Sequence, residues 1–288
     1  MKINNRSRWT IPVLFGFLAL TGFGVSAQAE GEATPPAVEK EDAIRSALGE
    51  YSGCVVLEGL DPSIEHSRLL YNAAMCTEAA SPCSTFKIAN TLIGLDTGVL
   101  SGPEFVIKWD GVQRSIPAWN ADQTLAEAFK NSTVWYYQEV ARRIGPERMQ
   151  AYLDKFEYGN RDITGGIDKF WLGSTLKISA VDQVAFLKKL TTGVLPLRQE
   201  TFQKGRQVMR LEQRGQVTLY GKNGSDGDLA TGKWTLGWFV GWLENEKTPG
   251  DPVYFAVRLD GGSGKDARRI AEDILTRLGH WPPAAAGK

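Results

Sequence analysis

Segments with the alternation typical of β-strands occur near both ends of this sequence, and the part between them has the periodicity of helices. The strand-like segments span 53–59 and 68–72 in the N-terminal part, and 217–220, 234–244 and 253–259 in the C-terminal part. Strands so far apart in sequence pair across the intervening chain, which favours one antiparallel sheet with an inserted helical region. The predicted fold class is therefore α+β.

Helices are expected at both ends of the sheet and throughout the insertion. Amphipathic patterns at 41–48 and at about 266–278 predict two terminal helices that flank the sheet. Helical spacing of apolar residues recurs in the central segments 124–130, 134–144, 146–156, 180–190 and 200–211. A cleft should form where the helical insertion meets the sheet.

One domain, residues 30–288, is expected, because no internal repeat or low-complexity linker divides the chain. Its sheet region would comprise about 40–83 and 213–279, and its helical region about 84–212. With 42% hydrophobic residues in 288, the chain can bury a large core. The 33 basic residues balance 33 acidic ones, which disfavours nucleic acid or an anionic membrane as a partner.

The N-terminus has the organisation of a secretory signal peptide. Three basic residues precede an apolar run at about 11–25, and Ala27-Gln28-Ala29 has the small-x-small pattern of a cleavage site. The apolar run is short for a bilayer span, which argues against an uncleaved anchor. We therefore expect residues 1–29 to be removed and the mature protein to be exported to a bacterial periplasm, with no attachment to the membrane.

Export permits disulfide bonds, and three cysteines allow at most one within the chain. Cys54 and Cys76 flank the first predicted hairpin and are the expected pair, which leaves Cys83 as a small buried side chain. Neither the number nor the spacing of the cysteines predicts a metal site.

Two Ser-x-x-Lys tetrapeptides occur, at Ser84–Lys87 and Ser174–Lys177. Residues three apart share one face of a helix, so a helical backbone would bring the serine hydroxyl towards the lysine amine. The first begins a long amphipathic pattern that would bury Lys87, whereas the second lies in a short segment before the next helix. The context favours Ser84 as a nucleophile.

Histidine is too scarce for a Ser-His-Asp triad, since only His66 and His280 occur and both lie outside the predicted core elements. A base for Ser84 must therefore be another residue type. Lysine is the candidate, because burial disfavours its ammonium form and lowers its pKa.

Further motifs follow Ser84-Thr85-Phe86-Lys87 in a fixed order. They are Ser132-Thr133-Val134, Tyr158-Gly159-Asn160, Trp171-Leu172, Lys222-Asn223-Gly224 and the run Gly237-Trp238-Phe239-Val240-Gly241-Trp242. Each alone is equally consistent with a helix cap or a turn. Together they closely resemble the class D (oxacillinase-type) serine β-lactamases over nearly the whole mature chain. The resemblance implies the fold shared by serine β-lactamases and penicillin-binding transpeptidases, and hydrolysis of the amide of penicillin-type antibiotics.

The resemblance also implies roles for residues around the nucleophile. Ser84 would form an acyl-enzyme, with the backbone N–H groups of Ser84 and Ser225 as the oxyanion hole. Lys87 would take up CO2 as a carbamate, N6-carboxylysine, and act as the general base. Three residues would surround that carbamate: Val134, Trp171 and Leu172. Beyond CO2 or bicarbonate, no cofactor or metal is implied.

Leaving-group protonation and substrate binding are implied for a second set of residues. Ser132 would relay a proton to the leaving nitrogen, and Lys222 would set the electrostatics of that relay. The substrate carboxylate would lie near Lys222, Asn223, Gly224, Ser225 and Arg268, with Arg269 as the neighbouring alternative. Tyr158 and Asn160 would shape the cleft. Asn223 replaces the family's usual threonine, so the choice among penicillins, cephalosporins and carbapenems stays open.

Two other functions share part of this motif set. A penicillin-binding sensor domain would be acylated without turnover, but such receptors carry transmembrane helices beyond the N-terminus, and none is evident. A cell-wall peptidase or transpeptidase shares Ser-x-x-Lys but matches Trp171-Leu172 less well. The expected partner is a small β-lactam, and the sequence is compatible with a monomer or a homodimer.

Overall fold

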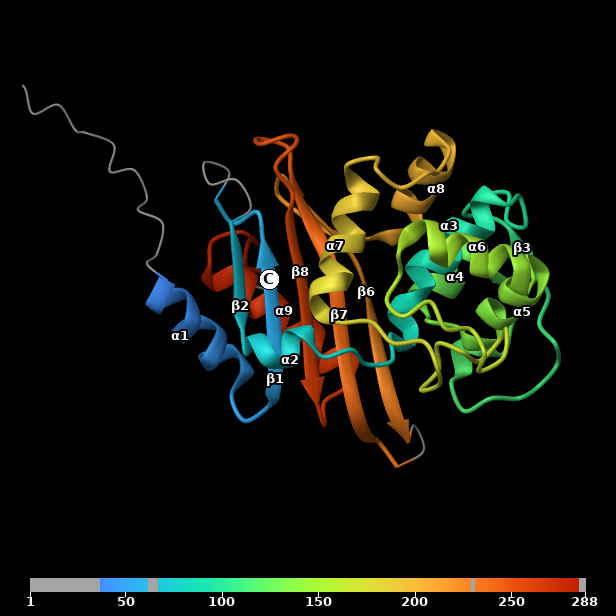
Figure 1. The fold of residues 1–288 in the computed structure, drawn as a ribbon, viewed down its shortest axis with the longest axis horizontal. Helices are drawn as coiled ribbons and strands as arrows, with labels where there is room; N and C mark the ends of the chain where they lie inside the picture. Colours follow the sequence, from blue (N-terminus) through green and yellow to red (C-terminus); the bar gives the residue numbers. More distant parts are fainter. Residues whose placement is uncertain (1–36, 62–66, 229–230, 285–288) are drawn as a thin grey trace, which may run out of the picture. The chain divides into compact units, whose positions relative to one another are not determined.

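The computed structural model describes residues 37–61, 67–228 and 231–284, so the predicted signal peptide and His66 lie outside the described residues. Within this part, strands from both ends of the chain form one sheet around which helices pack (Figure 1). None of the helices in these ranges is long and apolar enough to cross a membrane. The α+β class predicted from the sequence is confirmed.

Six antiparallel strands form the main sheet in the described ranges, in the order β2-β1-β8-β7-β6-β5. They are β1 (Ser52–Glu58), β2 (Arg68–Tyr71), β5 (Arg210–Arg214), β6 (Val217–Asp228), β7 (Lys233–Asn245) and β8 (Val253–Asp260). The N-terminal strand β1 pairs with the C-terminal strand β8 along its whole length, from Ser52 opposite Asp260 to Glu58 opposite Tyr254. The two ends of the domain are therefore joined by main-chain hydrogen bonds.

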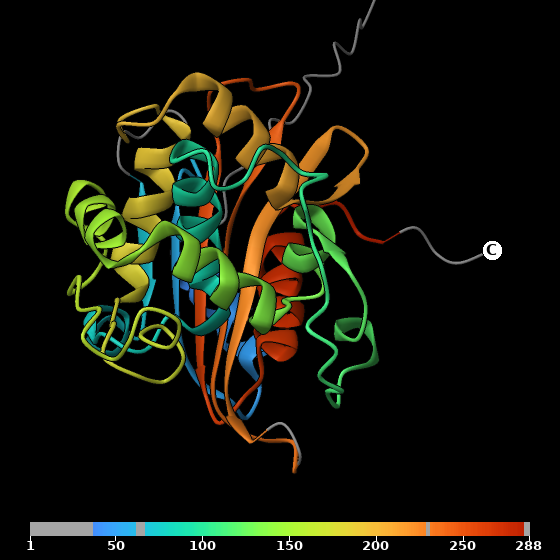
Figure 2. The ribbon, with the colours of Figure 1, turned by 90° about the vertical axis from the view of Figure 1, so that its right-hand side faces the viewer.

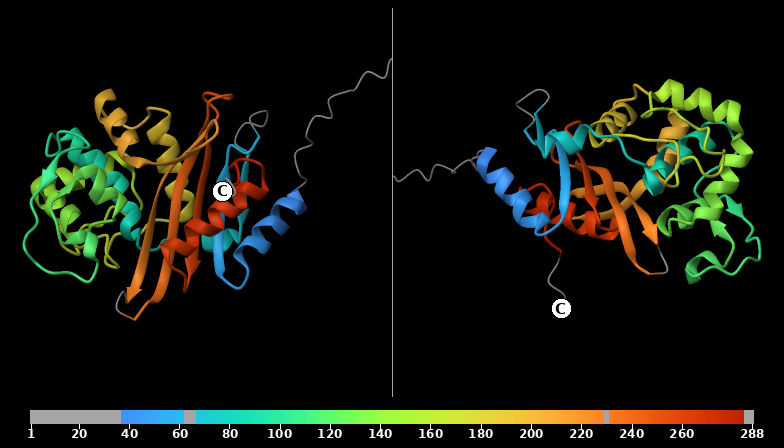
Figure 3. Two further views of the ribbon diagram at one scale, coloured as in Figure 1. Left: turned by 180° about the vertical axis from the view of Figure 1, so that it is seen from behind. Right: turned by 60° about the horizontal axis from the view of Figure 1, so that its bottom comes forward.

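The two faces of the sheet have different coverings. Helices α1 (Ala37–Leu48) and α9 (Gly264–Arg277) cover one face, where Phe239 and Val257 pack with Ile270 (Figure 3). The opposite face, with Trp238 and Val240, packs against the helical region. This division follows the alternation of side chains along a strand, which directs neighbouring residues of β7 to opposite faces.

The helical region lies in front of the second face when viewed as in Figure 2. Its helices are α2 (Ala73–Thr77), α3 (Lys87–Asp96), α4 (Leu125–Lys130), α5 (Val134–Ile144), α6 (Pro146–Phe156), α7 (Ala180–Thr191) and α8 (Gln199–Met209). Two 3-10 turns, η1 (Cys83–Phe86) and η2 (Pro117–Trp119), and the short strand pair β3 (Val106–Ile107) and β4 (Gln123–Thr124) complete it. Thr124 begins α4 with a capping box in which its hydroxyl and the Glu127 carboxylate bond each other's backbone N–H groups.

Two predicted boundaries are wrong, and both corrections concern strands next to the site. The helix expected to reach residue 211 ends at Met209, and Arg210 begins β5 by pairing with Tyr220. The strand expected to end at Tyr220 continues to Asp228, so Lys222, Asn223 and Gly224 lie inside β6. Pairing of β6 with β7 maintains this extended conformation despite the low strand propensity of its glycines.

The expected disulfide between Cys54 and Cys76 is absent, and the structure has Cys54, Cys76 and Cys83 as free, buried thiols. Cys76 belongs to helix α2, and its Sγ donates to the main-chain oxygens of Tyr71 (3.2 Å) and Val55 (3.6 Å). The neighbouring Cys76 thiol and burial both raise the pKa of Cys54. The prediction placed Cys76 beside a hairpin and did not foresee the helix that directs its thiol to these carbonyls.

Candidate active site

Ser84 and Lys87 lie where the 3-10 turn η1 continues directly into helix α3. Thr85 ties the turn to the preceding residue, since its backbone N–H and its hydroxyl both donate to Pro82 O. Lys87 Nζ lies 2.8 Å from Ser84 Oγ. The local geometry predicted for the first Ser-x-x-Lys is therefore present, although Ser84 itself belongs to the 3-10 turn and not to the α-helix.

Lys87 is buried completely, with no exposed surface. Its Nζ lies 5.4 Å from the centre of the Tyr137 ring on α5, and no carboxylate is among the influences on its pKa. Burial lowers that pKa from 10.5 to about 7. A substantial fraction of the lysine is therefore a neutral amine at neutral pH, which is the form that can accept a proton from Ser84.

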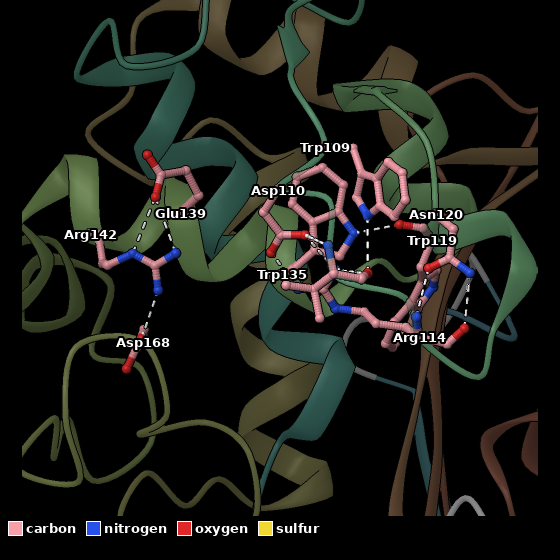
Figure 4. Close-up of polar contacts among 10 residues, drawn as sticks. Trp109, Asp110, Arg114, Trp119, Asn120, Trp135, Glu139, Arg142 and Asp168 are labelled. Atoms are coloured by element: carbon pink, nitrogen blue, oxygen red, sulfur yellow. Dashed lines mark hydrogen bonds and ion pairs between the residues drawn. The ribbon is translucent and has the colours of Figure 1, made fainter.

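Trp171 carries a buried donor that has no partner. Its indole Nε1 forms no hydrogen bond with any of the described residues, and the ring packs 5.5 Å from Phe86, the residue before Lys87. The Trp171 backbone is fixed because its carbonyl oxygen accepts from Ser81 Oγ at 3.0 Å. Arg142 on α5 also pairs with Asp168, three residues before Trp171 (Figure 4). An unpaired buried N–H is costly, which is consistent with an acceptor at this point in the working enzyme.

Ser132 forms the joint between helices α4 and α5. Asn131 ends α4, Thr133 precedes the first residue of α5, and Ser132 between them has a left-handed backbone with φ of 55°. Such a conformation is unfavourable for any residue except glycine. Val134 begins α5 and is half-buried, as is Leu172 beside Trp171.

Lys222 projects from β6 towards the same helical region and is almost fully buried, with 2% of its surface exposed. Its Nζ donates to Asn223 Oδ1 (2.9 Å) and Asn223 O (3.1 Å), and lies 5.7 Å from the centre of the Phe129 ring. Burial lowers the pKa of Lys222 well below 10.5, and the charges of Lys87 and Arg268 lower it further. Burial and the charge of Lys87 therefore both disfavour the ammonium form of Lys222.

Glycines bring β6 against the nucleophile. A Cβ on Gly224 would lie 3.1 Å from Ser84 N, and a Cβ on Gly264 would lie 2.4 Å from Gly224 O. Ser225 adds a side-chain link, since its Oγ accepts from Gly264 N at 2.8 Å. The absence of side chains at these two positions allows the backbone of β6 to approach Ser84 closely.

Arg268 lies close enough for its charge to act on Lys222, but its direct contacts are on the other face of the sheet. Its Nε donates to Glu272 at 2.7 Å, and its guanidinium lies 5.8 Å from the centre of the Phe239 ring. Phe239 belongs to the face covered by α1 and α9, whereas Lys222, opposite Val240, faces the helical region. The alternative, Arg269, is exposed.

Tyr158 and Asn160 have packing and backbone-linking positions. The Tyr158 ring is buried against Phe86 and Phe186. Asn160 donates to Thr175 O and accepts from Lys177 N, both at 2.9 Å. These contacts fix the segment between α6 and α7 and match the structural role expected for both residues.

Sequence reasoning missed three residues that contact this site: Tyr137 under Lys87, Phe129 beside Lys222, and Gln123. Tyr137 and Phe129 lie in predicted helices, but nothing in the sequence shows which helix face meets the lysines. Gln123, 4% exposed, hydrogen-bonds the residues on both sides of Ser132. A single glutamine before a capping box carries no recognisable pattern.

A cavity of about 1320 Å³ elsewhere, lined by residues such as Lys188, Tyr220 and Tyr254, includes none of the predicted catalytic residues. Its buried carboxylate Glu58 is paired with Arg68 and Lys188. The cavity with the largest volume of those described is therefore separate from the candidate site at Ser84 and Lys87.

Comparisons with known proteins show the family to which the chain is related. Residues 48–276 match the penicillin binding protein transpeptidase domain. A probable β-lactamase of Bacillus subtilis (strain 168), YbxI, is 36% identical over 274 residues, covering 94% of this chain and 98% of that protein. β-Lactamase OXA-48 of Klebsiella pneumoniae is 40% identical over 190 residues, 66% of this chain and 69% of its own. A crystal structure of a class D β-lactamase from Bacillus subtilis has a TM-score of 0.76 at 38% identity, covering 82% of this chain and 95% of that one.

Proposed function

This chain belongs to the class D β-lactamases, serine hydrolases that open the cyclic amide of β-lactams, and we propose that Ser84 is its nucleophile and Lys87 its base. The observation that carries the proposal is the 2.8 Å contact between Lys87 Nζ and Ser84 Oγ at a fully buried lysine. Because burial lowers the pKa of Lys87 to about 7, the amine can accept the hydroxyl proton near neutral pH.

Acylation follows from this pair. Lys87 takes the proton of Ser84, whose Oγ adds to the β-lactam carbonyl carbon to give a tetrahedral oxyanion. The backbone N–H groups of Ser84 and Ser225 are assigned to stabilise that oxyanion, and the close approach of Gly224 to Ser84 N supports the assignment. Collapse of the oxyanion breaks the carbon–nitrogen bond, and Ser132 relays the proton, donating its own to the leaving nitrogen and regaining the one that Lys87 took from Ser84. Water then hydrolyses the acyl ester and restores Ser84.

The family implies a carbamate on Lys87, formed with CO2, and the residues of this chain fit that group. Only a neutral amine reacts with CO2, and Lys87 has a pKa of about 7 in a fully buried position. Trp171 Nε1 is a buried donor without a partner in the described ranges, available for a carbamate oxygen. When bound, the group would supply a carboxylate-type general base. Val134 and Leu172 would limit the access of bulk water to it.

The carboxylate of the substrate is assigned to the β6 strand, at Lys222, Asn223, Gly224 and Ser225. Lys222 is held by its hydrogen bond to Asn223 Oδ1, and a substrate carboxylate beside it would favour its ammonium form. Ser225 Oγ accepts from Gly264 N, which leaves its own O–H to donate to a ligand. Arg268 is left out of this set, because its guanidinium is engaged by Glu272 on the other face of the sheet.

Export to the periplasm through the signal peptide at residues 1–29 is part of the proposal. It rests on the basic residues, the apolar run and the Ala27-Gln28-Ala29 pattern of the sequence. In that compartment the enzyme would meet penicillin-type antibiotics before they reach their targets. N-terminal sequencing of the exported protein should begin at Glu30.

Steady-state hydrolysis of a chromogenic β-lactam and of a penicillin tests the proposed function. We expect many turnovers per enzyme, and a covalent adduct on Ser84 detectable by mass spectrometry after rapid quenching. A single stoichiometric acylation without turnover would instead identify a penicillin sensor. Retained hydrolysis in Ser84→Ala would overturn the assignment of the nucleophile.

A further inference from the structure

We propose that Gln123 is a positioning residue that holds Ser132 in place for the transfer of a proton to the leaving nitrogen. This inference rests on the proposed function of Ser132. Ser132 has an unfavourable backbone conformation, and Gln123 would keep its hydroxyl in the position that proton transfer requires. Four observations carry it: the conformation of Ser132, the contacts of the Gln123 amide, the burial of Gln123, and the support behind it.

Ser132 needs such support because of its position. It lies between Asn131, the C-cap of α4, and Thr133, the N-cap of α5, and its φ of 55° is a value that glycine adopts freely and serine does not. A glycine would relieve this strain, but it would also remove the hydroxyl. The serine therefore depends on its surroundings to keep the backbone in this conformation.

Gln123 contacts the residues on both sides of Ser132. Its Oε1 accepts hydrogen bonds from Asn131 Nδ2 (3.2 Å) and from Thr133 Oγ1 (3.3 Å). At the other end of the same amide, Nε2 donates to Ala118 O at 3.0 Å. One planar group thus joins the residues before and after Ser132 to the loop that precedes β4.

Burial makes these contacts specific. Gln123 is 4% exposed, and Thr133 is fully buried, so water does not readily replace the amide at these atoms. The side chain of Thr133 does not cap α5. Its hydroxyl donates to Gln123 Oε1 instead. Loss of the amide would remove the acceptor of the buried Thr133 hydroxyl on one side of Ser132 and that of the half-buried Asn131 amide on the other.

The loop that holds the other end of the amide is itself fixed by aromatic and charged residues (Figure 4). Trp135 Nε1 donates to Trp119 O at 2.8 Å, and Trp119 Nε1 donates to Asn131 O at 3.0 Å. Arg114, paired with Asp110, exchanges backbone hydrogen bonds with the side chain of Asn120. Gln123 therefore connects Ser132 to a rigid support.

The expected consequence is kinetic. Misplacement of a reacting group by about 1 Å can lower a rate about a hundredfold, without a comparable change in substrate binding. Gln123→Met keeps the length of the side chain and removes both hydrogen-bonding atoms. We expect the acylation rate constant of this variant to fall about tenfold to a hundredfold, with the dissociation constant of the non-covalent complex unchanged within about twofold.

The test is a double-mutant cycle of Gln123→Met with Ser132→Ala, measured as acylation rate constants by stopped flow. Gln150→Met is the matched control, because the partners of Gln150 among the described residues are Asp154 and Arg161 O, away from the site. It should leave the rate unchanged. If Gln123 acts through Ser132, adding Gln123→Met to Ser132→Ala should change the rate by less than about twofold.

The outcomes separate the two proposals. A small effect of Ser132→Ala by itself would overturn the proposed function of Ser132, and the inference with it. A large effect of Ser132→Ala with no effect of Gln123→Met, or with additive effects in the double variant, would overturn the inference alone. Should Gln123→Met fail to fold, Thr133→Val removes one of the two bonds to Oε1. A fall in acylation rate of a few-fold would support the inference, and no fall would overturn it.

Discussion

The segments 84–87 and 174–177 have the same Ser-x-x-Lys spacing but different backbones. In the first, the turn η1 runs into α3, and Lys87 Nζ meets Ser84 Oγ at 2.8 Å inside the core. The second is irregular chain between α6 and α7, where Lys177 is only half-buried and its backbone N–H is bonded to Asn160. Equal spacing therefore brings the serine hydroxyl to a neutral amine only where a helical turn aligns the side chains and burial lowers the pKa of the lysine.

The largest expected difference between the two segments concerns their serines. Ser84→Ala should lower kcat/KM for a penicillin by at least about a thousandfold, because it removes the nucleophile. Ser174→Ala should stay within a few-fold of the unmodified enzyme. Hydrolysis followed by absorbance, with thermal unfolding as a control for folding, measures both. Comparable losses in the two variants would contradict the distinction.

The lysines should differ in activity and also in the pH dependence of stability. Lys87→Met should abolish hydrolysis, whereas Lys177→Met should retain it. Because the folded pKa of Lys87 is about 7 and its ordinary value is 10.5, the unfolded chain binds more protons between these pH values. The free energy of unfolding should therefore rise with pH in this window by up to about 1.4 kcal/mol per pH unit relative to Lys87→Met.

Denaturant unfolding of the unmodified protein and of Lys87→Met at several pH values, in bicarbonate-free buffer, measures the difference between their free energies of unfolding. Taking this difference cancels the contributions of the buried tyrosines, whose raised pKa values lower the free energy of unfolding as the pH rises at high pH. The same pKa predicts that acylation in bicarbonate-free buffer rises between about pH 6 and 8 as Lys87 loses its proton. If the difference in the free energy of unfolding does not depend on pH, Lys87 is not desolvated in the way that the structure indicates.

Trp171 tests whether Lys87, and not Lys177, carries a carbamate. Trp171→Phe keeps an aromatic ring beside Phe86 and removes the unpaired N–H. We expect a loss of about tenfold to a hundredfold in kcat, typical of removing a group that orients a catalytic base, with recovery on adding bicarbonate. Gln183→Met, which removes a buried amide bonded to Thr85, is the comparison for general packing effects. A loss that bicarbonate does not reverse would argue against a carbamate held by Trp171.

The smallest effect is expected at Asn223. Asn223→Thr restores the family's usual residue on β6 and keeps an oxygen acceptor for Lys222. We expect kcat/KM values for penicillins to change by less than about threefold, with larger changes among bulkier β-lactams because the hydroxyl is smaller than the amide. Comparing one penicillin, one cephalosporin and one carbapenem measures the profile.

Local signals explain which elements were predicted accurately. Helices α5 and α6 have the bounds expected from the sequence, because Gly145 with φ of 81° ends one and Pro146 begins the other. The extent of β6 was underestimated because its glycines read as a turn. In the structure, Gly224 lies opposite Trp238 within a long strand pair. The paired strand, and not the local sequence, determined that conformation.

The sequence by itself determined the α+β class and the pairing of strands from both chain ends, and it singled out Ser84 and Lys87 for the proposal, because periodicity and ordered motifs can be read along the chain. Only the tertiary structure decided which face of the sheet Arg268 joins, that Cys76 bonds carbonyl oxygens as a free thiol, and that Gln123 brackets Ser132. Those outcomes depend on how helices rotate and pack against the sheet. The first Ser-x-x-Lys differs from the second for the same reason, since burial by distant segments gives Lys87 its lowered pKa.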